Sequence, residues 1–298
     1  MTIAPESHIG PVSLTVADLD REREFYERAI GLRVLGDEGD ADGSTVRLGA
    51  DGTVVIELNV DPDAPPRRRG TTGLFHLAIL VPSRADLSGA LRRVVGAGGP
   101  LAGASDHLVS EALYLADPEG NGLEVYRDRP REEWRRVDGQ IEMATLPLDL
   151  DSLLAEQGEG ESSHAPAGTR IGHVHLHVAD LAAAEEFYAG VLGFDVTVRG
   201  YPGALFLSAG GYHHHIGVNT WAGEGAPAPP PGSRGLRDFA IVLPEVTELD
   251  AAEGRLRVAG AEARRDAEGV HTADPSGNGI VLTTNQAAQG RSAPWPAS

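Results

Sequence analysis

The sequence contains neither cysteine nor lysine, and each absence excludes a class of chemistry. Without cysteine the chain has no disulfides, no thiolate metal ligands and no cysteine nucleophile. Without lysine it cannot form a Schiff base through a lysine amine, and it has no P-loop lysine. Every basic side chain is therefore Arg or His.

Basic charge is scarce, and no long apolar run is present. The formal net charge of −19 argues against nucleic acid and anionic membranes as partners, because both select basic surfaces. The N-terminal residues lack the basic and apolar regions of a signal peptide, and no segment is apolar enough to span a bilayer. We therefore expect a cytoplasmic enzyme or binding protein, and 298 residues can hold two ordinary domains.

The chain does contain an internal repeat. Ile9-Gly10-Pro11-Val12 returns as Ile171-Gly172-His173-Val174, and Gly73-Leu74-Phe75-His76 is answered by Gly235-Leu236-Arg237-Asp238. Where one copy has His, the other has Pro or Asp. A scaffold that is copied while its polar interior residues are not is typical of a duplicated fold that holds one active site.

Four segments share one pattern, in which an alternating strand leads into a helix and then into short strands. Asp18 and Asp180 stand at helix N-cap positions, and the runs that follow end near Gly31 and Gly193. The pattern predicts an α+β fold of four β-α-β-β-β modules, at 8–60, 73–127, 170–221 and 235–284.

The linkers divide the modules into two pairs. We predict one unit at 8–127 with modules one and two, and another at 170–285 with modules three and four. Between them, 128–169 is expected to be a linker with a short helix from Leu148 to Leu154 and a mobile Glu/Gly/Ser-rich run. The Pro/Gly-rich stretches 60–72 and 222–234 are connectors, and the tail from Gln286 is expected to be loose.

Histidines gather in module three, where six of the eleven lie between residues 173 and 215. We place all six in two strands, and strand alternation puts His173, His175 and His177 on one face. In the 213–215 run, alternation puts His214 opposite its neighbours. Because the equivalent strand of the other copy carries Pro11, the fold does not require His173 for structural reasons.

His76 and Glu124 stand in the apolar strands of module two, where a carboxylate must be paired, exposed or bound to metal. Their copies in module four are Asp238 and Val281, so both polar residues change together. Two His and one carboxylate with open coordination positions suit non-haem Fe(II) oxygen chemistry, although Mn, Co, Ni or Zn would also fit these ligands.

Four motifs give the chain a recognisable pattern: IGHVHLHVADL, GGYHHHIGVNTW, GLFHLAILVP and DHLVSEALYLADPEGNGLEVYRDRP. With them the chain resembles the vicinal oxygen chelate superfamily, and within it the extradiol ring-cleaving dioxygenases, most closely the Bacillus-type catechol 2,3-dioxygenases. The resemblance covers nearly the whole chain. It implies two open barrel-like halves, an Fe(II) cofactor with Mn(II) as the alternative, and cleavage of a catecholic substrate by O2 to a muconic semialdehyde. Relatives commonly form dimers or tetramers, so a homo-oligomer is expected.

The resemblance also assigns site residues. The metal triad of the family falls on His76, Glu124 and His173, and its acid–base histidine falls on His214, with His213 and His215 as alternatives. His107 and Tyr114 match a His and a Tyr that help to hold substrate and oxygen without binding the metal.

The ligand positions differ from those of the commoner four-module extradiol enzymes, which place all three ligands in modules three and four. Here two ligands lie in module two, and a triad needs all three atoms about 2 Å from one metal. Modules two and three must therefore face each other, with modules one and four as the metal-free half. A glyoxalase-type isomerase or lyase and a metal-free binding protein of the bleomycin-resistance type are the alternative functions.

Overall fold

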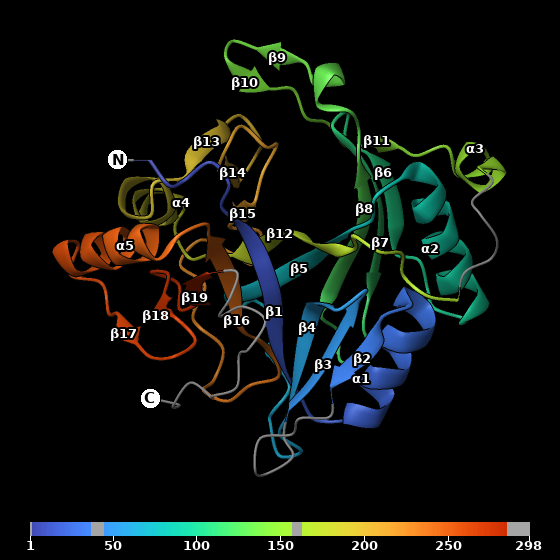
Figure 1. Ribbon diagram of the computed structural model, residues 1–298, viewed down its shortest axis with the longest axis horizontal. Helices are drawn as coiled ribbons and strands as arrows, with labels where there is room; N and C mark the ends of the chain where they lie inside the picture. Colours follow the sequence, from blue (N-terminus) through green and yellow to red (C-terminus); the bar gives the residue numbers. More distant parts are fainter. Residues whose placement is uncertain (1, 37–44, 157–162, 285–298) are drawn as a thin grey trace.

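The structure is a computed structural model that describes residues 2–36, 45–156 and 163–284. The predicted loose tail from Gln286 and part of the Glu/Gly/Ser-rich run lie outside these residues. The four predicted modules are present (Figure 1). Module one contains β1 (His8–Val16), α1 (Leu19–Phe25), a π-helical turn η1 (Tyr26–Ile30), β2 (Arg33–Gly36), β3 (Thr45–Ala50) and β4 (Thr53–Val60). Module two contains β5 (Gly73–Leu80), α2 (Arg84–Gly96), β6 (Gly103–Asp106), β7 (Ser110–Ala116) and β8 (Gly122–Asp128).

The second half of the chain repeats this order. Module three contains β12 (Arg170–His177), α4 (Leu181–Glu185), the π-helical turn η3 (Glu186–Val191), β13 (Asp195–Val198), β14 (Ala204–Ser208) and β15 (Ile216–Asn219). Module four contains β16 (Gly235–Leu243), α5 (Val246–Val258), β17 (Arg264–Arg265), β18 (Val270–Ala273) and β19 (Gly279–Thr284). Asp18 and Asp180 accept hydrogen bonds from amides of the first helical turns, which confirms both predicted N-caps.

The two sheets pair module two with module three and module four with module one, as the positions of the candidate ligands predicted. One nine-stranded sheet begins with β11 (Leu146–Pro147), which follows module two, and continues β6-β7-β8-β5-β12-β15-β14-β13. It joins module two to module three through the antiparallel pair β5 and β12. An eight-stranded sheet runs β17-β18-β19-β16-β1-β4-β3-β2, and joins module four to module one. The division of the chain at 8–127 and 170–285 stays a prediction, because each sheet takes strands from both of these units.

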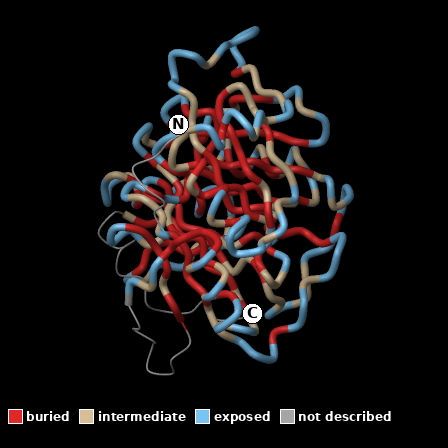
Figure 2. The backbone as a smooth tube through the Cα atoms, turned by 90° about the vertical axis from the view of Figure 1, so that its right-hand side faces the viewer, coloured by how far each residue is buried: buried red, intermediate tan, exposed pale blue. Residues whose placement is uncertain are grey.

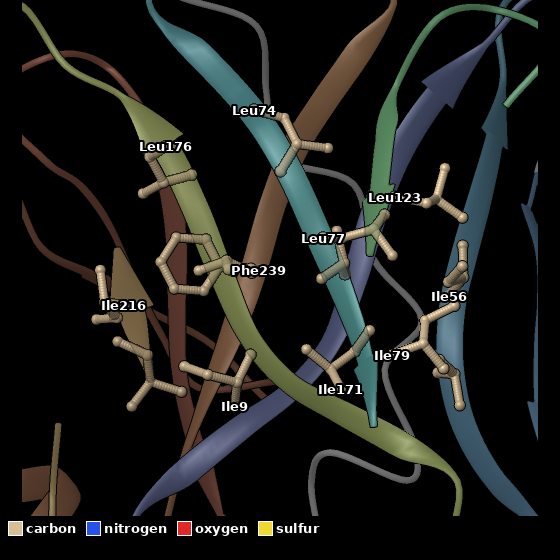
Figure 3. Packing of buried hydrophobic residues seen from close by; sticks show 14 of the residues in the cluster. Ile9, Ile56, Leu74, Leu77, Ile79, Leu123, Ile171, Leu176, Ile216 and Phe239 are labelled. Carbon is tan, nitrogen blue, oxygen red and sulfur yellow. The ribbon is translucent and has the colours of Figure 1, made fainter. Parts of the chain in front are cut away.

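The main hydrophobic core lies between the two sheets (Figure 3). Leu74, Leu77 and Ile79 of β5 are fully buried and pack with Ile171 and Leu176 of β12. Figure 2 shows that buried residues concentrate at the centre of the molecule. Because neighbouring strand residues point to opposite faces, the residues between these leucines and isoleucines, such as His76 and Ala78, face the other side of the nine-stranded sheet.

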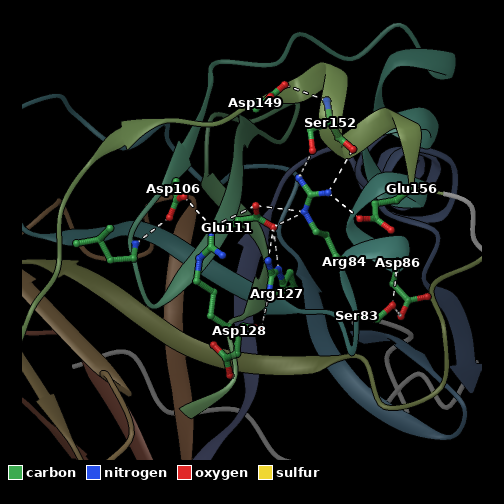
Figure 4. A network of polar contacts seen from close by, with 12 residues as sticks. Ser83, Arg84, Asp86, Asp106, Glu111, Arg127, Asp128, Asp149, Ser152 and Glu156 are labelled. Atoms are coloured by element: carbon green, nitrogen blue, oxygen red, sulfur yellow. Dashed lines mark hydrogen bonds and ion pairs between the residues drawn. The ribbon is translucent and has the colours of Figure 1, made fainter. Parts of the chain in front are cut away.

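The segment between modules two and three has structure of its own. It holds η2 (Arg131–Glu133), the small hairpin of β9 (Arg136–Val137) and β10 (Gln140–Ile141), β11 (Leu146–Pro147) and α3 (Leu150–Ala155). The predicted short helix is thus confirmed, although it begins two residues later and ends one residue later than expected. Arg84 of α2 ties this segment to module two, because it contacts Glu156 beside α3 (Figure 4). The buried carboxylate of Glu111, which Arg127 also contacts, holds Arg84 in place. None of the helices in the described ranges is long and apolar enough to cross a membrane.

Candidate metal centre and active site

Sheet register brings the three candidate ligands together. Ala78 of β5 pairs with Glu124 of β8 on one side and with His173 of β12 on the other. His76 stands two residues before Ala78, so that its side chain points to the same face. Ala78 is fully buried, and its small side chain leaves space between the two larger ones.

The ligand atoms of His76, Glu124 and His173 lie within 4.8 Å of one another. Oε2 of Glu124 is 3.1 Å from Nε2 of His76 and 3.3 Å from Nε2 of His173. All three residues are buried, yet neither histidine Nε2 has a hydrogen bond among the described residues. Atoms that each bind one ion at about 2 Å stand roughly 3 Å apart, so these residues fit a metal ion.

The protonation states of His173 and Glu124 suit metal binding. Burial lowers the pKa of His173 to about 4, so this imidazole is neutral near pH 7. Burial alone would raise the pKa of Glu124, but the attraction to His173 and His76 outweighs it and holds that pKa well below its usual range. A carboxylate and neutral imidazoles are the protonation states that bind metal.

A cavity of about 350 Å³ opens onto this cluster. His76, Glu124, His107, Tyr114 and His214 all line it, while His173 lies behind them. The cavity therefore brings together five of the six residues to which the sequence assigns a function, and the sixth lies within ligand distance of Glu124.

His107 and Tyr114 form a hydrogen-bonded pair beside Glu124. His107 Nδ1 donates to the backbone oxygen of Ala144 at 2.6 Å, and its Nε2 lies 2.6 Å from the Tyr114 hydroxyl. Burial, followed by the charge of Glu124, raises the pKa of Tyr114 well above its usual value. The phenol therefore stays protonated at neutral pH and remains a hydrogen-bond donor.

The 213–215 histidines do not lie in a strand, contrary to the prediction. They form a bend between β14 and β15, because Gly210 and Gly211 have φ values of 58° and 69°, which favour glycine and turn the chain. Only His214 of the three lines the cavity, and its ring lies 4.0 Å from that of His173.

The other two histidines point elsewhere. His213 Nε2 donates to Asp128 Oδ1 at 2.9 Å, and its Nδ1 lies 2.8 Å from Nδ1 of His214. His215 Nδ1 accepts a hydrogen bond from the amide of Ala209 at 3.1 Å. The geometry thus favours His214 as the residue that meets a ligand in the cavity.

Known proteins resemble this chain in sequence and in fold. The sequence model of the Glyoxalase/Bleomycin resistance protein/Dioxygenase superfamily matches residues 8–125 and 170–282. The chain belongs to this superfamily. It is 44% identical to the catechol-2,3-dioxygenase of Bacillus subtilis, over 92% of this chain and 96% of that protein.

Solved structures support the superfamily fold. Glyoxalase I from Zea mays matches 95% of this chain and 94% of its own with a TM-score of 0.58 and 17% identity. A solved protein of Bacillus subtilis matches 96% of this chain and 86% of its own with a TM-score of 0.67 and 14% identity. At these identities the likeness concerns the fold alone.

Several residues that line this cavity are not predicted from the sequence. Phe75, Phe206 and Trp221 supply aromatic walls, and His175 lines the same cavity. The alternation that placed His175 on the face of His173 was a usable signal for that residue. The aromatic residues come from separate strands and loops, and no local pattern joins them.

The sequence also does not predict that the segment 128–169 contributes to the cavity. Met143, Ala144 and Thr145 line the cavity, and the Thr145 hydroxyl lies 2.9 Å from that of Tyr201, another lining residue. The segment that the sequence predicts to be only a linker thus forms one wall of the candidate active site.

Proposed function

We propose that this chain is an Fe(II)-dependent extradiol dioxygenase that cleaves a catechol ring with O2 to a muconic semialdehyde. The observation that carries the proposal is the single cavity in which a two-His, one-carboxylate cluster meets His214, His107 and Tyr114. The likeness to a catechol-2,3-dioxygenase over nearly the full length supports the same reaction class.

His76, Glu124 and His173 would hold the metal. Fe(II) is favoured over Mn(II) through the likeness to the extradiol dioxygenases, because two His and one carboxylate fit either ion. When bound, the ion would make the catechol hydroxyls more acidic and supply the redox chemistry that O2 needs.

His214 would take and return the substrate proton. In the His213 tautomer that donates only from Nε2, to Asp128, the Nδ1 atom accepts, and His214 then donates from its own Nδ1. This fixes the tautomer of His214 and leaves its Nε2 lone pair free to accept a proton. Burial lowers the pKa of His214 well below its usual value, so the ring is neutral before substrate binds.

Tyr114 and His107 would hold substrate and oxygen. The buried Tyr114 hydroxyl keeps its proton, and the Ala144 carbonyl orients the His107 ring that contacts it. Phe75 and Trp221, whose ring centroids lie 5.3 Å apart, would pack against the aromatic substrate and exclude water.

Anaerobic loading with Fe(II), addition of catechol and then admission of oxygen test the proposal. We expect oxygen uptake together with a yellow ring-cleavage product. Protein loaded with Zn(II), which has no redox chemistry, is the matched control and should consume no oxygen. Bound iron without oxygen uptake on several substituted catechols would contradict the proposal and favour an isomerase.

A further inference from the structure

A second cavity, of about 260 Å³, lies in the metal-free half. Four of its lining positions are the repeat equivalents of positions that line the metal cavity. Asp238 pairs with Ser13 in the register in which His76 pairs with His175, and His271 pairs with Val281 as Tyr114 pairs with Glu124. The equivalent pairs are Arg237 and Phe75, Asp238 and His76, His271 and Tyr114, and Val281 and Glu124.

The copied cavity is lined by positively charged side chains where the first cavity has candidate metal ligands. Arg67, Arg234 and Arg237 line it, whereas no arginine lines the metal cavity among the described residues. Val281 has no ligand atom where Glu124 has a carboxylate. A divalent cation is thus disfavoured at this place, and an anion is favoured.

Neutral oxygen atoms hold the three guanidinium groups in place. Arg237 Nη1 donates to Asn59 Oδ1 at 2.8 Å, Arg67 Nη1 donates to the Leu74 carbonyl at 2.5 Å, and Arg234 Nε donates to the Ala64 carbonyl at 2.9 Å. Their positions are therefore fixed while most of their charge is left for another partner.

Carboxylates neutralise these arginines only weakly. Arg237 and Arg234 each reach one carboxylate, of Asp238 and Glu119 respectively, at 3.9 Å, the limit of an ion pair. Glu119 also accepts hydrogen bonds from the Ala17 and Asp18 amides, which share its charge.

Arg67 has no ion pair with any described residue, and it is half-buried in a chain with a net charge of −19. Burial lowers its pKa, which reflects the free-energy cost of a guanidinium that is partly removed from water. A bound anion would offset this cost.

Apolar residues also line the cavity. They are the connector residues Pro229, Pro230 and Pro231, together with Leu236 and Ile280. We infer that this cavity binds a small organic carboxylate, with the acid group on Arg67 and Arg237 and the apolar body against the prolines. A planar guanidinium matches a carboxylate through two parallel hydrogen bonds. The inference does not depend on the reaction at the metal site.

Isothermal titration calorimetry on the anaerobic, Fe(II)-loaded protein tests this site with three probes. Benzoate has both the acid and the apolar body, benzamide is its neutral analogue, and inorganic phosphate is an anion without an apolar body. We expect saturable binding of benzoate, with phosphate weaker and benzamide not bound. Equal affinity for benzoate and benzamide, equal affinity for benzoate and phosphate, or no binding of benzoate would overturn the inference.

Variants separate this site from the metal cavity. Arg67→Gln and Arg237→Gln should each weaken benzoate binding by about tenfold or more, because each removes one charged donor pair. Arg28→Gln, which makes the same charge change on an exposed helix surface, should leave it unchanged. Thermal melts confirm folding of each variant. Benzoate that binds the Arg67→Gln/Arg237→Gln double variant as tightly as the wild type would overturn the inference, because it would then occupy another place.

Discussion

The two sequence repeats use the same hydrogen bonds to join the half with the candidate metal site, modules two and three, to its copy, modules four and one. Tyr26 donates to Asp117 at 3.0 Å, and its repeat equivalent Tyr188 donates to Asp274 at the same distance. Each of these aspartates also accepts from the side chain of an asparagine four residues later. Both repeats thus need the same buried tyrosine–aspartate anchor, whatever the cavities contain.

The halves differ where side chains face the cavities. At equivalent strand positions one half has His76 and Glu124, and the other has Asp238 and Val281. Both sets fit the same backbone, so the fold alone does not determine the chemistry. A few exchanges on a retained sheet separate a candidate redox site from a candidate anion site.

The largest effect is expected when Glu124 of module two is replaced by valine, the residue that module four has at the equivalent position. Glu124→Val should abolish metal binding and lower kcat by at least about a thousandfold, because a catalytic metal supplies several kcal/mol of transition-state stabilisation. Metal content after gel filtration and oxygen uptake measure both effects. Glu124→Gln, which keeps the shape but not the charge, shows whether the lost charge is the cause.

The reverse exchange tests the other half. Asp238→His adds an imidazole to the copied cavity, but Pro11 and Val281, at the positions equivalent to His173 and Glu124, offer no ligand atom. We expect one metal ion per chain in this variant, as in the wild type. A second bound ion would contradict this reading of the metal-free half, and Glu124→Val that retains metal would contradict the ligand assignment.

The next largest effect concerns His214, which lines the cavity but is not one of the three candidate ligands. His214→Ala should keep one metal ion per chain and lower kcat by about 100- to 10,000-fold, the usual contribution of a general acid–base. Loss of metal from this variant would contradict its separation from the ligand set. His215→Ala, on the neighbouring ring that points away from the cavity, is the matched control and should affect kcat far less.

The sequence predicted the scaffold and three candidate ligands that the structure brings together, but not the cavity walls. Strand alternation, N-caps and the repeat are local patterns, so they predicted the four modules, and ligand placement predicted which modules face each other. The bend at residues 213–215 was missed because consecutive histidines beside Ile216 and Val218 read as a strand, while Gly210 and Gly211 turn the chain. Thr145 and Tyr201 meet only through tertiary packing, which no sequence period encodes.

A smaller effect is expected from the hydrogen bonds that link Asp128 through His213 to His214. Asp128→Asn removes the carboxylate that fixes the His213 tautomer, so His214 should lose its fixed tautomer too. We expect kcat to fall by about 10- to 100-fold at constant metal content, as is typical when a supporting partner is removed. The 15N shifts of the His214 ring report the tautomer directly.

Tyr212→Phe is the matched control for this effect. It removes the hydrogen bond from Tyr212 to Asp128 but keeps that from His213. This variant should keep the His214 tautomer and most of kcat. Unchanged 15N shifts of the His214 ring in Asp128→Asn would contradict the proposal that Asp128 fixes the tautomer of His214.

The smallest effect is on stability, and it again separates the histidine-rich half from its copy. Burial lowers the pKa of His215 to about 3 from an ordinary value of 6.5, and that of His173 to about 4. The unfolded chain therefore takes up protons at a higher pH than the folded chain, so stability is full above about pH 6.5 and falls as the pH drops toward these folded values. Between pH 7.5 and 5.5 each histidine should cost the metal-free protein roughly 1 kcal/mol in the free energy of unfolding. Urea titrations at the two pH values measure the loss, and His215→Asn, whose amide oxygen can still accept from Ala209, should show a smaller one. An identical loss in this variant would show that the acid sensitivity comes from elsewhere in the chain.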